Sequence, residues 1–77
     1  MKIITLDNRG LMPPEPLVRM LTACDDLQAG DRIVAAMDRR PLLLFPELDE
    51  RGLRYTCEPR GEGFEVTIER PDGEAVP

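Results

Sequence analysis

The chain has 77 residues, 42% of them hydrophobic and 32% charged, which is the composition of a small soluble globular domain. Fifteen acidic and ten basic residues give a formal net charge of −5, and only three residues are aromatic. The chain lacks the basic surplus and the stacking side chains of a nucleic-acid binder. With two cysteines and no histidine, it cannot supply the four ligands of a structural zinc site.

The first half of the chain predicts a β-α-β unit. Residues 2–6 (KIITL) are typical of a short strand, and residues 7–12 form the turn that follows it. We expect a helix to open at Pro13 and Pro14, because the first N–H groups of a helix have no intrahelical partner. Residues 31–37 (DRIVAAM) predict a second strand, parallel to the first. The buried face of the helix should consist of Leu17, Met20, Leu21, Cys24 and Leu27.

The second half predicts a helix and a β-hairpin. Residues 42–51 indicate the helix, with Pro46 near its start or at a break, because a proline in a helix interior costs about 3 kcal/mol. In residues 53–58 and 64–69, apolar and polar side chains alternate, which is typical of strands with one buried and one solvent-exposed face. The loop over residues 59–63 has the length and chemistry of a hairpin connection.

The complete order is therefore β-α-β-α-β-β. It predicts an α/β (α+β) two-layer sandwich, in which both helices lie on one face of a four-stranded mixed sheet. We expect a single domain over residues 1–70 and a flexible C-terminal tail over residues 71–77.

A candidate site lies where the two predicted parallel strands end, because ligands of α/β proteins bind outside the carboxyl ends of such strands. This edge should bring Asp7 and Arg9 close to the turn after the second strand, which contains Arg39 and Arg40. Arginines beside a helix N-terminus are typical of an anion site. Glu15 opposes this assignment, since it already places a carboxylate in the first helical turn.

The prolines at positions 13, 14 and 16 also remove N–H donors from the turn that would hold an anion. Two interpretations therefore remain open. Asp7 and Arg9 form a local network in the turn while Arg39 and Arg40 are solvated, or these residues form a contact surface for a partner or a small anion.

The chain offers few groups for catalysis. It contains neither serine nor histidine, so a Ser-His or Cys-His nucleophile pair cannot form. Cys24 and Cys57 both fall on apolar faces of their predicted elements, where cysteine behaves as a small hydrophobe. We therefore predict structural roles for both thiols, no metal and no cofactor.

The run LDNRGLMPPEP resembles the small TusA/SirA-like sulfur-carrier proteins, whose signature is Asp-x-Arg-Gly-Leu-x-Cys-Pro-x-Pro. The resemblance implies the same β-α-β-α-β-β fold and places the persulfide cysteine of that family at Pro13, which has no sulfur. Within this fold family, the chain is most similar to an uncharacterised subgroup in which Cys-Pro-x-Pro reads Pro-Pro-Glu-Pro. The residues that match the signature are Asp7, Arg9, Gly10, Leu11, Pro14 and Pro16.

Together these observations predict a non-catalytic protein-binding or regulatory module, not an enzyme. The alternatives are a sulfur-relay protein that uses Cys24 or Cys57, and a sensor for a small anionic ligand. We expect a protein partner, no membrane contact and a cytoplasmic location, since no apolar run approaches the ~20 residues that span a bilayer and no signal peptide is visible. The expected binding edge consists of Asp7, Arg9, Gly10, Leu11, Met12, Pro13, Glu15, Arg39 and Arg40.

Overall fold

The computed structural model describes residues 1–71, and their element order confirms the predicted β-α-β-α-β-β sequence. The flexible tail predicted over residues 71–77 lies, apart from Pro71, outside the described residues. The elements are β1 (Ile3–Asp7), α1 (Glu15–Asp25), β2 (Arg32–Met37), α2 (Leu44–Glu50), β3 (Arg54–Arg60) and β4 (Gly63–Glu69).

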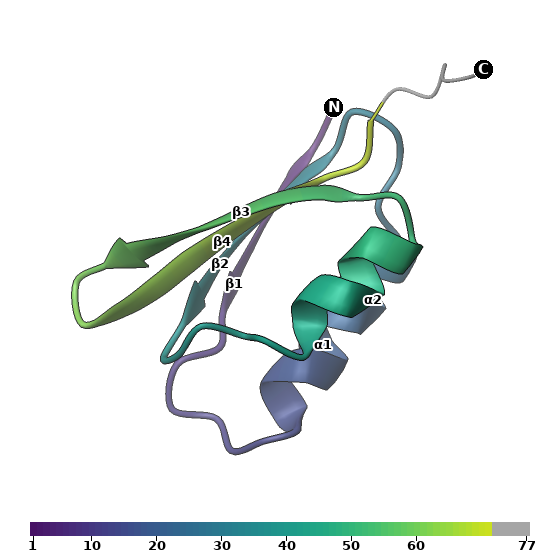
Figure 1. Cartoon of the computed structure of the whole chain (residues 1–77). Coiled ribbons are helices and arrows are strands. Elements are labelled where there is room, and N and C mark those ends of the chain that lie inside the picture. Colours follow the sequence, from purple (N-terminus) through teal and green to yellow (C-terminus); the bar gives the residue numbers. More distant parts are fainter. Residues whose placement is uncertain (72–77) are drawn as a thin grey trace.

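The four strands form one mixed sheet in the order β1-β2-β4-β3, and both helices cover the same face of it (Figure 1). β1 pairs with β2 in parallel, whereas β4 pairs antiparallel with both β2 and β3. The predicted two-layer α+β architecture is therefore confirmed. The parallel pair matters for the site, because the turns that leave β1 and β2 emerge side by side at one end of the sheet.

A single apolar core fills the space between the sheet and the helices. Its members are no more than 5% exposed, which is the burial expected of aliphatic side chains in a well-packed core. The opposite face of the sheet is polar, and Glu69 pairs there with both Arg32 (2.6 Å) and Arg54 (3.4 Å). The core comprises Met20, Cys24, Leu27, Ile33, Ala35, Met37, Leu44, Leu48, Leu53, Val66 and Ile68.

The helices are shorter than the sequence pattern indicated. α1 begins at Glu15, with Pro14 at the N-cap position and Pro16 in the first turn, where a missing N–H costs no intrahelical hydrogen bond. It ends at Asp25, although the apolar stripe continues to Leu27. The Arg70 guanidinium donates hydrogen bonds to the carbonyls of Leu27 (2.6 Å) and Cys24 (3.3 Å), so a distant side chain satisfies this end of the helix.

The hairpin between β3 and β4 is tighter than predicted. Its loop contains only Gly61 and Glu62, while Pro59 and Arg60 continue the edge strand β3. Gly61 has a φ of 58°, the positive value that the first loop residue of a type II′ hairpin requires. α2 begins at Leu44, which places Pro46 in its first turn as predicted.

Candidate functional site

A hydrogen bond joins the turns that leave β1 and β2. The backbone N–H of Gly10 donates to Oδ2 of Asp38 over 2.7 Å. Gly10 has a φ of 82°, a left-handed conformation that glycine adopts without a steric penalty. The structure thus brings together the two chain segments in which the sequence placed its candidate residues.

Within the first turn, Asp7 and Arg9 bind each other. The Arg9 guanidinium donates to both carboxylate oxygens of Asp7 at 2.8 Å, and the Arg9 backbone N–H donates to Oδ1 at 3.1 Å. The hydrogen bonds from Arg9 hold the pKa of the Asp7 carboxyl far below its usual range, and the pKa of Arg9 is raised in turn. The Arg9 charge is therefore compensated within its own turn, as the first of our two interpretations expected.

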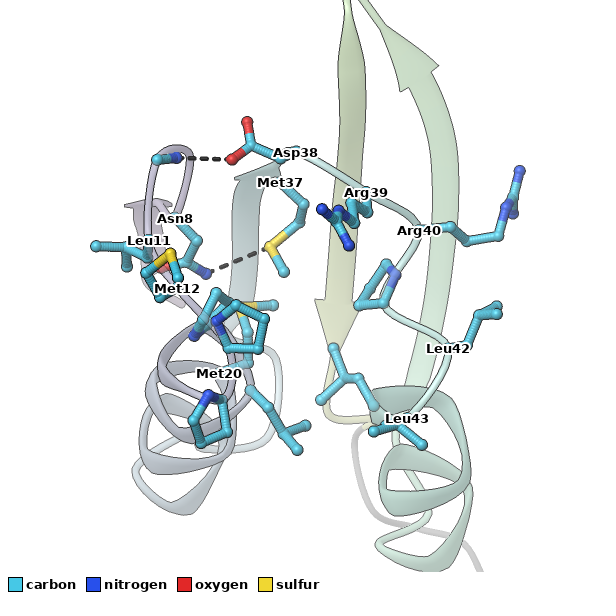
Figure 2. A pocket seen from close by; sticks show the side chains of 17 residues that line it. Asn8, Leu11, Met12, Met20, Met37, Asp38, Arg39, Arg40, Leu42 and Leu43 are labelled. Carbon is cyan, nitrogen blue, oxygen red and sulfur yellow. Dashed lines mark hydrogen bonds between the residues drawn. The ribbon is translucent and has the colours of Figure 1, made fainter.

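Next to these turns lies a groove of about 680 Å³ between the start of α1 and the segment that precedes α2 (Figure 2). Three of its apolar side chains are largely exposed: Met12 (76%), Leu42 (65%) and Leu43 (76%). The groove is lined by Asn8, Gly10, Leu11, Met12, Pro13, Pro14, Pro16, Leu17, Met20, Met37, Asp38, Arg39, Arg40, Pro41, Leu42, Leu43 and Leu44.

The groove has two arginines at its rim. Figure 2 shows Arg39 extending from the β2–α2 segment toward the groove, whereas Arg40 points away from it. The Arg40 guanidinium lies over the ring of Phe64, 5.0 Å from its centroid, which is a cation–π contact. Among the described residues neither arginine forms a salt bridge. Arg39 is therefore the cation best placed to meet an acidic group in the groove.

The N-terminus of α1 offers little to a bare anion. Pro14 occupies the N-cap position without a capping side chain, and Pro16 has no N–H to donate. Two of the remaining amides are engaged, since Glu15 N–H donates to the Met12 carbonyl and Val18 N–H to the Pro14 carbonyl. This wall of the groove therefore presents a mainly apolar surface with few free N–H donors.

The predicted edge residues divide into two sets. Asp7, Arg9 and Glu15 do not line the groove, while Gly10, Leu11, Met12, Pro13, Arg39 and Arg40 do.

Several groove residues were not predicted from the sequence, among them Asn8, Leu42 and Leu43. In β1, every second side chain, Ile4 and then Leu6, faces the core, and Asn8 is the next residue in this alternation. The alternation could therefore have identified Asn8 as an inward-facing residue. Leu42 and Leu43 belong to an apolar run that we assigned to a helix, whereas they precede α2 and remain exposed.

Neither cysteine lines the groove. Cys24 is 1% exposed on the inner face of α1, and burial raises the pKa of its thiol. Cys57 is half-buried and packs against the core from β3. Both thiols lie where the sequence placed them, on apolar faces.

No cluster of three or more His, Cys, Asp or Glu side chains is arranged to hold a metal ion within residues 1–71. Over the same residues, no helix has the length and apolar character needed to cross a membrane.

The chain matches a known protein family. A family model described as "Uncharacterized conserved protein (DUF2249)" matches residues 5–70, a span that runs from β1 to the residue after β4. No curated protein and no solved structure matches the chain.

Proposed function

The chain belongs to the uncharacterized conserved protein family DUF2249, and we propose that it is a non-catalytic module that docks a protein partner in the groove. Membership confirms the predicted assignment to an uncharacterised family. The kinship with TusA/SirA-like sulfur carriers is part of our proposal, supported by the shared element order and by the signature residues from Asp7 to Pro16.

The observation that supports docking best is the concentration of exposed apolar side chains at the groove. Six large hydrophobic residues are exposed among those described, and Met12, Leu42 and Leu43 are three of them. A cluster of large exposed apolar side chains around a groove is typical of an interaction site. Because these three stand largely in solvent, a protein surface would cover more of them than a small enclosed ligand could.

The charges at the rim indicate what kind of partner fits. Arg39 has no carboxylate partner within residues 1–71, although the chain as a whole has a net charge of −5. The nearby Asp38 carboxylate already accepts the Gly10 N–H. A partner segment with apolar side chains and an acidic residue would therefore complement the groove in both respects.

The alternatives receive less support. A sulfur relay needs an accessible thiolate, but Cys24 is buried with a raised pKa and Cys57 lies outside the groove. A sensor for a small anion needs several converging donors, but Arg9 is bound to Asp7 and the helix N-terminus is rich in proline. An apolar groove suits neither function.

Affinity capture from a native lysate tests the proposal. Wild type is compared with a Met12→Ala, Leu43→Ala variant and with a control variant, Thr56→Ala, on the helix-free face of β3. We expect at least one protein that wild type and the control retain and the groove variant loses. Identical sets of captured proteins for all three would contradict docking at the groove.

A further inference from the structure

Asn8 in the floor of the groove has a hydrogen-bonding capacity that the described part of the chain does not use. The residue is 1% exposed, and its Oδ1 has no partner among the described residues. Its Nδ2 donates to the sulfur of Met37 over 3.3 Å, and thioether sulfur is only a weak acceptor (Figure 2). Buried polar groups normally have partners, so an orphan of this kind calls for an explanation.

The contact with Met37 fixes which way the amide faces. Thioether sulfur accepts a hydrogen bond but cannot donate one, so the Nδ2 end must face it. The acceptor Oδ1 then points elsewhere and remains unsatisfied. A leucine has the same branching and would fill this position without leaving a polar atom unpaired, so packing alone does not account for an asparagine here.

Few side chains that line the groove can form a hydrogen bond or an ion pair with a partner. The four prolines of the groove have no N–H, and the Asp38 carboxylate accepts from Gly10. Among the side chains that line the groove, Asn8 keeps a buried acceptor without a partner, and Arg39 is a cation that forms no salt bridge within the described residues.

We propose that the segment docking in the groove is an apolar peptide that donates a hydrogen bond from an N–H or O–H group to Asn8 and places a carboxylate against Arg39. This inference rests on the proposed docking function and adds the chemistry of the partner. Because Oδ1 is closed off from solvent, docking must shift a side chain of the wall. Met12 is unbranched and 76% exposed, so it can move without disturbing the core.

A displayed library of random peptides provides the probe. The folded domain is used to select binders, and the same selection is repeated with Asn8→Leu, Asn8→Ala, Arg39→Gln and Leu43→Glu. Urea unfolding of each variant establishes that it is folded. Asn8→Leu should be at least as stable as wild type, because it removes a buried unpaired acceptor.

The expected result has three parts. Wild type enriches peptides that combine apolar residues, an Asp or Glu, and a donor side chain at a constant position, and Leu43→Glu enriches none of them. Both Asn8 variants lose the preference for the donor and bind the wild-type peptides roughly tenfold more weakly, the loss of one hydrogen bond. Arg39→Gln loses the acidic preference and keeps the donor.

The experiment distinguishes failure of the proposed docking function from failure of the proposed role of Asn8. If no enriched peptide depends on Leu43, the proposed docking function fails, and the inference fails with it. If the peptides depend on Leu43 but bind the Asn8 variants with unchanged affinity, docking stands and the role of Asn8 is refuted. If neither Asn8 variant folds, the amide is structural and the inference is likewise overturned.

Discussion

The backbone N–H of Gly10 donates a 2.7 Å hydrogen bond to the carboxylate of Asp38, across 28 positions of sequence. It ties the turn after β1 to the turn after β2 and so holds one end of the groove at a fixed width. Because the prolines that follow this turn have no N–H group, few backbone donors can join the two turns. The Gly10 N–H is one of them.

Replacing Asp38 tests this tie. We expect Asp38→Ala to lower the free energy of unfolding by about 0.5–1 kcal/mol, since the hydrogen bond is charge-assisted but exposed. The Gly10 amide should also exchange its proton faster. Asp38→Asn keeps an acceptor in place and serves as the control. Unchanged exchange at Gly10 in the alanine variant would show that the turns are held by other contacts.

Gly63 should tolerate no side chain. A Cβ atom at this position would collide with the backbone carbonyl oxygen of Met37, which cannot move without disrupting the pairing of β2 with β4. We expect Gly63→Ala to cost more than about 2 kcal/mol in urea unfolding.

Gly52→Ala is the matched control. Its Cβ would meet nothing within 4 Å, and its φ of 71° should cost only about 1 kcal/mol. Equal losses for the two variants would contradict the steric explanation for Gly63.

The Asp7–Arg9 pair predicts a defined dependence on pH. Because the folded-state pKa of Asp7 is lowered, its contribution to stability is complete above the unfolded-state pKa of about 3.9 and is lost as the pH falls toward the folded value. In an NMR titration, the Asp7 carboxyl should therefore remain ionised at a pH where the exposed carboxyls of an unfolded chain are half protonated. Arg9→Gln should raise the pKa of Asp7 toward its ordinary value. An Asp7 that titrates normally in wild type would refute the network.

The two thiols should differ in reactivity. Cys24 is buried with a raised pKa, so a thiol reagent should modify it only after unfolding, whereas Cys57 should react in the folded protein. Mass spectrometry after brief alkylation with and without urea measures this difference. Incubation with a persulfide donor should add no ~32 Da to Cys24 in the native state. A stable adduct on either cysteine would revive the sulfur-relay alternative.

Local signals in the sequence predicted the elements of this fold because each has its own cue: the alternation of residues 64–69, the apolar stripe of α1 and the proline in the first turn of α2. They did not predict that β4 lies between β2 and β3, since strand order depends on contacts between distant segments.

Part of the groove lining escaped prediction for a similar reason. Leu42 and Leu43 look like core residues in the sequence, and only the late start of α2 leaves them in solvent. Asn8 looked like an ordinary turn residue. It directly follows β1, however, and its side chain is buried on the same side of the strand as Ile4 and Leu6.

Site-specific photo-crosslinking tests the central claim, docking at the groove, most directly. A photoreactive amino acid replaces Leu43 at the groove or Thr56 on the helix-free face, and the cells that express each variant are irradiated. We predict a covalent complex with a defined protein from position 43 and none from position 56, with the crosslinked peptide of that protein containing apolar residues beside an Asp or Glu. Equal crosslinking from both positions, or from neither, would contradict a docking site at the groove.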